Sequence, residues 1–189
     1  MQLYATLSLD VLAEDVEVIA RHHHPSGSEI AKAYIVGVLG QNVRTSMLAQ
    51  EDPDSPRLGY PSLVEMRQFR VENPTQYKNL GDYCLLFSGL FYERAKQRGF
   101  LEYQASVGAD AYRRFGKLID TTGSPDPLFD ELSQDFSQWE KVLHVLSAQG
   151  MSDAGLVQLL ESHLQKPDDR YAAILQAKGI SVASNFGEN

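Results

Sequence analysis

The chain has 189 residues, of which 43% are hydrophobic and 22% charged, which is typical of a globular protein with one sizeable core. Its formal net charge of −8 argues against a nucleic-acid partner, because binding to a phosphate backbone relies on clustered lysine and arginine. The single cysteine, Cys84, excludes an intramolecular disulfide framework and fits the reducing cytoplasm.

Helical periodicity dominates the N-terminal part of the chain. Apolar residues recur at spacings of three and four after Ser8, which predicts a helix that ends before Pro25. A second helix is predicted over 28–50, and its apolar residues fall on several faces, so we expect burial on most sides. Gly37 and Gly40 lower the helix propensity of this segment. We attribute both glycines to the close approach of a neighbouring helix.

The centre of the chain predicts a helical hairpin, after a proline-rich loop at 51–61 and a short helix opened by Ser62. The first helix of the hairpin, 74–97, carries apolar residues at alternating spacings of three and four. The second helix, 100–120, carries the same pattern. Gly99, between the two, ends the first helix. Glycine inside a helix lowers the stability of that helix, so another interaction must compensate for the loss. We therefore expect three glycines of the hairpin to lie at close contacts between helices: Gly81, Gly89 and Gly108.

Three further helices are predicted at 127–149, 152–166 and 170–178. The first of them repeats the three-four spacing, so we expect it to pack against the hairpin. Residues 181–189 are expected to fray. These patterns together predict an all-α fold, in which residues 1–180 form a single-domain bundle of six to eight helices around the hairpin.

Few residues carry a clear chemical signal. The run His22-His23-His24 offers three imidazoles, but consecutive helical residues point about 100° apart, so we interpret the run as a helix C-terminus rather than a metal site. Glu140 and His144 are four residues apart and can point together. Neither a Glu-x-x-His nor a His-Glu-x-x-His metal motif occurs, and no cofactor motif occurs, so we expect no metal and no cofactor.

The hairpin carries one polar set suited to binding. Asp82 and Tyr83 lie on its first helix, and Tyr112 and Arg113 lie on its second. A carboxylate, two hydroxyls and a guanidinium within an apolar helical pocket suit a small molecule, and a pocket of roughly 300 Å³ or more would then lie among them. The alternative that we prefer is structural: Asp82 and Arg113 pair with each other and fix the register of the hairpin. Cys84 lies on the apolar stripe, so we expect it to be buried and unreactive.

The segment Leu80–Phe91, LGDYCLLFSGLF, followed by GADAYR at 108–113, resembles a bacterial family of uncharacterised proteins. Members of that family carry a GDYALFxSGLFP motif and then a GxxAYR motif, and Tyr92 stands here in place of the proline. The resemblance covers residues 28–149 and implies a helical fold without assigning a catalytic residue. The motif positions that it singles out are Gly81, Asp82, Tyr83, Ser88, Gly89, Gly108, Tyr112 and Arg113.

The sequence shows no set of catalytic residues, and its many helices would offer surfaces for binding. We therefore favour a non-catalytic helical protein that takes part in protein–protein interactions or in regulation. Its surface would bind another protein, including a second copy of itself as a homodimer. The alternative is a small-molecule-binding protein or an enzyme with its polar site at the hairpin. No stretch reaches the ~18 apolar residues of a membrane span, and the acidic N-terminus is unlike a signal peptide, so we expect a cytoplasmic protein without a membrane partner.

Overall fold

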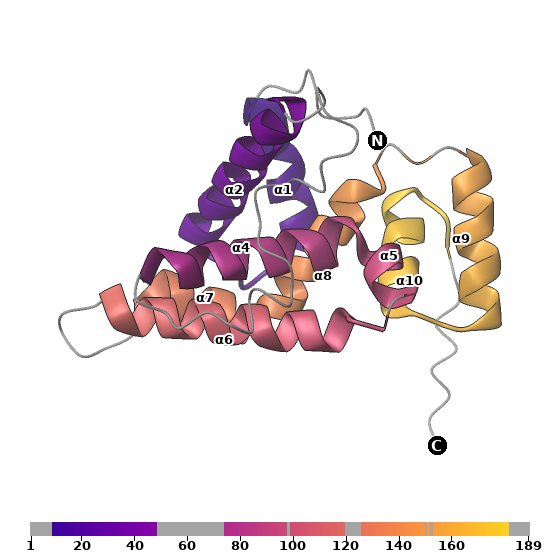
Figure 1. The fold of residues 1–189 in the computed structure, drawn as a ribbon. Helices are drawn as coiled ribbons and strands as arrows, with labels where there is room; N and C mark the ends of the chain where they lie inside the picture. The colour runs from indigo at the N-terminus through magenta and orange to yellow at the C-terminus, as the bar shows by residue number, and fades with distance from the viewer. Residues whose placement is uncertain are drawn as a thin grey trace.

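A computed structural model describes residues 9–48, 74–97, 99–119, 126–149, 151 and 153–181, and gives only the backbone for residues 42–48, 94 and 154. All regular secondary structure in these residues is helical, which confirms the all-α prediction (Figure 1). The predicted loop at 51–61, the short helix at Ser62 and nearly all of the expected frayed tail lie outside the described residues. The helices are α1 (Leu9–His23), α2 (Glu29–Leu48), α4 (Pro74–Leu90), α5 (Tyr92–Gln97), α6 (Leu101–Ile119), α7 (Pro127–Gln134), α8 (Phe136–Ser147), α9 (Asp153–Gln165) and α10 (Asp169–Ala177).

The predicted hairpin is present and makes the most extensive helix contact in the described part of the chain. Its helices α4 and α6 lie side by side, with α8 packed on α4 and α7 packed on α6 (Figure 1). The predicted helix 74–97 is interrupted at Phe91, one turn after Ser88 donates a hydrogen bond of 2.6 Å to the Cys84 carbonyl. Such back-bonding bends helices. The predicted helix 127–149 is interrupted at Asp135, whose φ of −100° and ψ of 22° depart from helical values.

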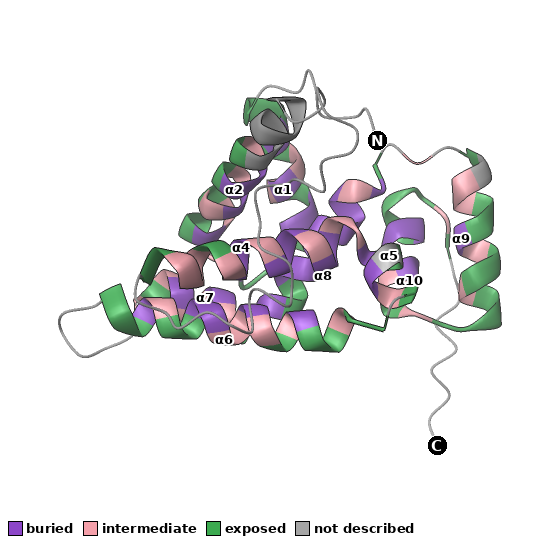
Figure 2. Ribbon diagram, viewed as in Figure 1, coloured by how far each residue is buried: buried purple, intermediate pink, exposed green. Residues whose placement is uncertain are grey.

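Close packing at the three hairpin glycines is confirmed. A Cβ placed on Gly81 would lie 2.6 Å from the Tyr112 ring, and one on Gly108 would lie 2.7 Å from Cβ of Cys84. A Cβ on Gly89 would lie 2.6 Å from Cβ of Leu143 on α8. Figure 2 shows buried residues concentrated where α4, α6 and α8 meet. Trp139 and Tyr112 are the largest fully buried side chains of this core.

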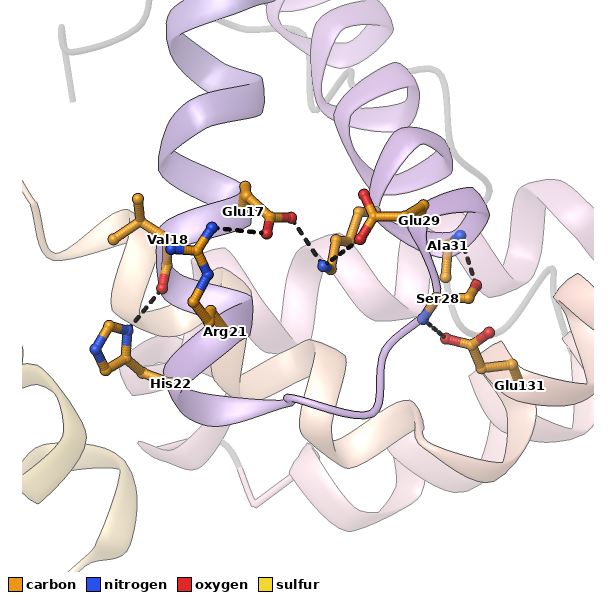
Figure 3. Close-up of polar contacts among 9 residues, drawn as sticks. Glu17, Val18, Arg21, His22, Ser28, Glu29, Ala31 and Glu131 are labelled. Atoms are coloured by element: carbon orange, nitrogen blue, oxygen red, sulfur yellow. Dashed lines mark hydrogen bonds and ion pairs between the residues drawn. The ribbon is translucent and has the colours of Figure 1, made fainter.

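Polar contacts link the start of α2 to α1 and to α7 (Figure 3). Lys32 on α2 forms an ion pair of 2.8 Å with Glu17 on α1. Ser28 caps α2 by accepting a hydrogen bond of 3.1 Å from the Ala31 amide, and its own amide donates to Glu131 on α7 across 2.9 Å. The first turn of α2 is therefore fixed against both α1 and α7.

Burial of α2 on most sides was expected, and the first half of the helix departs from this expectation along one face, while Ala31, Ile35, Val38 and Leu39 are buried. Ile30 is 68% exposed, and Ala33 and Gly37 are exposed with it. Gly40 does lie against α1, since a Cβ there would lie 2.6 Å from Cδ2 of Leu9. No described atom lies within 4 Å of a Cβ placed on Gly37, so the expected close neighbour of Gly37 is not found in the described part of the chain.

Of the last two described helices, α9 packs mainly on α10, and α10 packs on α8 as extensively as on α9 (Figure 1). Leu159 of α9 is buried, whereas Leu164 is 72% exposed. None of the described helices combines the length and the hydropathy needed to cross a membrane.

Candidate functional site

A buried carboxylate at the centre of the hairpin joins three helices. Asp82 on α4 is only 5% exposed and accepts three hydrogen bonds. The Tyr112 hydroxyl on α6 donates to Oδ1 across 2.8 Å, and the Tyr34 hydroxyl on α2 donates to the same atom across 2.5 Å. The ammonium of Lys78 donates to Oδ2 across 2.8 Å. Asp82 is thus saturated by groups of the protein itself, as a buried charge must be.

Tyr112 is the most enclosed member of this group. Burial raises its pKa well above the ordinary value, and the Asp82 carboxylate adds to the rise because a phenolate beside it would be repelled. The ring packs edge-on to Tyr34 at 6.2 Å and lies 5.8 Å from the ring of Phe129. Tyr112 therefore acts as a hydrogen-bond donor at any physiological pH.

Of the four predicted site residues, the structure brings Asp82 and Tyr112 together and directs the other two elsewhere. Arg113 forms an ion pair with Asp110 one turn earlier on α6, so the expected Asp82–Arg113 pair is wrong. The physical reason is that Tyr112 and Arg113 are consecutive and point about 100° apart, so that only one of them faces α4. The Tyr83 ring lies beside Phe87, 5.7 Å between centroids.

Two partners of Asp82 were missed by the sequence analysis. Lys78 precedes Asp82 by four residues on α4, a spacing at which opposite charges pair on a helix, so it could have been found. Tyr34 lies 48 residues before Asp82 and carries no local signal of this contact.

A second polar network fixes α10 to the core. Glu140 on α8 is 2% exposed and forms an ion pair of 3.0 Å with Arg170 on α10. Burial raises the pKa of Glu140, while Ser88 and Arg170 act against that rise. The Arg170 guanidinium also lies 4.5 Å from the centroid of the Tyr92 ring. His144 packs on the Tyr92 ring. Burial lowers the pKa of His144 to about 3, so its imidazole is neutral.

Asp168, just before α10, forms the outer part of this network. It accepts a hydrogen bond of 2.9 Å from the Tyr92 hydroxyl and one of 2.6 Å from Lys96 on α5. Lys96 also reaches the Tyr171 hydroxyl at 3.1 Å, and Tyr171 donates to Glu93 across 2.9 Å. Tyr92, where the resemblance leads one to expect proline, is therefore a central member of the network.

Three atoms of this network lack a hydrogen-bond partner within the described residues: Oε1 of Glu140, Nδ1 of His144 and Nη1 of Arg170. Glu140 and His144 are both buried on α8, and each joins the network through another residue, Glu140 through Arg170 and His144 through the Tyr92 ring. Among the described residues, no group of three His, Cys, Asp or Glu side chains is placed to hold a metal ion.

The three consecutive histidines point to different surroundings. Nδ1 of His22 lies 2.8 Å from the Val18 carbonyl on the surface of α1. His24 is buried, with its ring edge-on to Trp139 at 4.6 Å. Burial lowers the pKa of His23.

A groove of about 530 Å³ is lined mainly by residues of α6. Arg113 lines it, together with Asp110 and Arg114 of the same helix, Tyr77 of α4 and Ser133 at the end of α7. A volume of this size suits a small molecule. Asp82, Tyr83 and Tyr112 do not line it, so the predicted polar set does not form a common pocket there. Comparison with known protein families, with curated proteins and with solved structures finds no match to this chain, and the resemblance to a bacterial family therefore stays a prediction.

Proposed function

We propose that this chain is a non-catalytic helical protein that binds another protein, a second copy of itself in the first instance, through the exposed face of α2. The observation that carries the proposal is Ile30, which is 68% exposed on a helix whose apolar residues are spread around its circumference. Helices of that composition are ordinarily buried on all sides. Ala33 and Gly37 follow at helical spacing, so these residues form one apolar face.

Small residues on this face suit a second helix. Glycine in a helix costs about 0.5–1 kcal/mol relative to alanine. Within the described residues Gly37 has no close neighbour to offset that cost, so a helix from a second molecule would supply the missing contact. A two-fold axis through α2 would bring the same face of both copies together, which is the usual geometry of a homodimer. The reducing cytoplasm is the expected compartment, since the one cysteine, Cys84, is free and buried.

Sedimentation equilibrium over a wide range of protein concentrations tests the proposal. We expect a monomer–dimer equilibrium, and we expect Ile30→Asp to weaken it by at least about tenfold, because the isoleucine would be buried twice at a symmetric interface. Leu164→Asp on α9 is the matched control, since Leu164 is 72% exposed and lies on another helix. A protein that stays monomeric throughout, or equal weakening by both variants, would contradict self-association through α2.

A further inference from the structure

The groove on α6 contains two guanidinium groups that converge on one carboxylate. Arg113 and Arg114 both form ion pairs with Asp110, the second through Nε at 2.5 Å from Oδ2. The two arginine side chains are 56% and 57% exposed, and Arg114 is also hydrogen-bonded to the Tyr77 side chain, so the N–H groups that these contacts leave over face solvent. Two cations around one anion leave a net positive charge at this point of an otherwise acidic protein.

The rest of the groove supplies neutral donors and an apolar wall. Ser106 and Ser133 line it, and neither side chain makes a hydrogen bond in the part of the chain that the structure describes. The ring of Tyr77 lies 5.9 Å from Cζ of Arg114, and Leu80 completes the apolar side. A cationic end beside an aromatic and aliphatic wall suits a ligand with an anionic head and an apolar body.

We propose that this groove binds a phosphate monoester carried on a small aromatic body. The planar forks of Arg113 and Arg114 match phosphate oxygens, and serine hydroxyls are further donors to the same group. A phosphate carries up to two negative charges, so it attracts the arginines more strongly than the single charge of Asp110 that now holds them. The inference concerns α6 and is independent of self-association through α2.

Titration of the isotope-labelled protein with phenyl phosphate, followed by nuclear magnetic resonance of the backbone amides, tests this proposal. We expect saturable shifts centred on residues 106–114. The double variant Arg113→Gln, Arg114→Gln should weaken binding by at least about tenfold, because charge-assisted hydrogen bonds are lost. Asp110→Asn should strengthen binding, because the competing carboxylate is removed. Arg21→Gln, which removes an exposed arginine from α1, should change nothing.

The opposite signs expected for these variants separate binding from loss of structure, because unfolding would weaken binding in every variant. Phenol and benzoate, titrated in parallel, test the two parts of the ligand. Phenol binding as tightly as phenyl phosphate would overturn the anion site, and benzoate binding as tightly would overturn the choice of phosphate. Absence of saturable shifts, an unchanged affinity of the double arginine variant, or weaker binding by Asp110→Asn would overturn the proposal altogether.

Discussion

The Tyr112 hydroxyl donates a hydrogen bond of 2.8 Å to Oδ1 of Asp82, and this contact crosses the interior between α4 and α6. It has the role that the sequence suggested for an Asp82–Arg113 ion pair, since it fixes one helix of the hairpin against the other. The difference matters for stability. A hydrogen bond to a buried charge is not screened by solvent as a surface ion pair would be.

Tyr112→Phe removes this donor while keeping the ring. We expect the free energy of unfolding to fall by about 1.5–3 kcal/mol, because a buried carboxylate loses one of its hydrogen bonds. Urea denaturation followed by circular dichroism measures the change. Ser106→Ala, which removes a hydroxyl from an exposed position on the same helix, is the control and should change the stability by less than about 0.5 kcal/mol. Equal effects of the two variants would show that the Tyr112 hydroxyl contributes nothing specific.

Gly108→Ala and Gly37→Ala should change stability in opposite directions. The new methyl group at Gly108 would meet Cβ of Cys84 at 2.7 Å as well as the Phe136 ring, and a Cβ atom can move only with its backbone. We expect a loss of about 1–3 kcal/mol from overpacking. At Gly37 no described atom of the same chain is close, so in protein dilute enough to be monomeric alanine should raise the stability by about 0.5–1 kcal/mol. Melting temperatures that rise in both variants would refute close packing at Gly108.

Arg170→Met should be more damaging than replacing both members of the Glu140–Arg170 pair. The single variant leaves a 2% exposed carboxylate without its cation, at a cost of about 3–5 kcal/mol. The double variant Glu140→Met, Arg170→Met removes the charge as well, and we expect it to regain much of that loss. Arg114→Met breaks an exposed pair and should cost less than about 1 kcal/mol. Glu140→Met is the second single variant of this double-mutant cycle, and additive effects of the two single changes would disprove the coupling.

His144 should make the protein less stable as the pH falls. Its pKa is about 3 in the folded chain against 6.5 for an ordinary histidine, so between these values the unfolded chain binds a proton that the folded chain does not. Keeping this imidazole neutral costs on the order of 5 kcal/mol by pH 3. Glu140 acts in the opposite direction above its ordinary pKa of 4.5, because its pKa is raised on folding.

Urea denaturation at several pH values between 3 and 7 in the wild type and in His144→Asn isolates the histidine. The free energy of unfolding of His144→Asn should fall much less toward low pH than that of the wild type. His22→Asn, on the exposed surface of α1, should show the same fall as the wild type. A wild-type profile that is retained in His144→Asn would assign the decline to other groups.

The helices of the hairpin and the segment 127–149 were predictable because their three-four spacing is a local pattern. The close contacts of Gly81, Gly89 and Gly108 were predictable for the same reason, since a costly residue inside a regular pattern signals packing. The interruptions at Phe91 and Asp135 were not foreseen, because intact helical spacing continues through both.

The polar contacts were harder to predict because they join residues that are distant in the sequence. Tyr34 reaches Asp82 across 48 residues, and Arg170 reaches Glu140 across 30. A sequence pattern shows that a polar residue lies on an apolar face, but the choice of its partner depends on how helices cross. Arg113 illustrates the point, since a rotation of about 100° along α6 separates it from the interior that Tyr112 occupies.

The order in which the chain is synthesised has a consequence for the ion pair between Glu140 and Arg170. The carboxylate belongs to α8, whereas its cation is translated 30 residues later, near the end of the described chain. While a ribosome still holds α10, the α8 surface that α10 covers carries an uncompensated acid. Burial of that surface is therefore unfavourable until Arg170 emerges. A chain terminated before residue 170 would therefore leave Glu140 without its cation and the α8 surface without the helix that covers it.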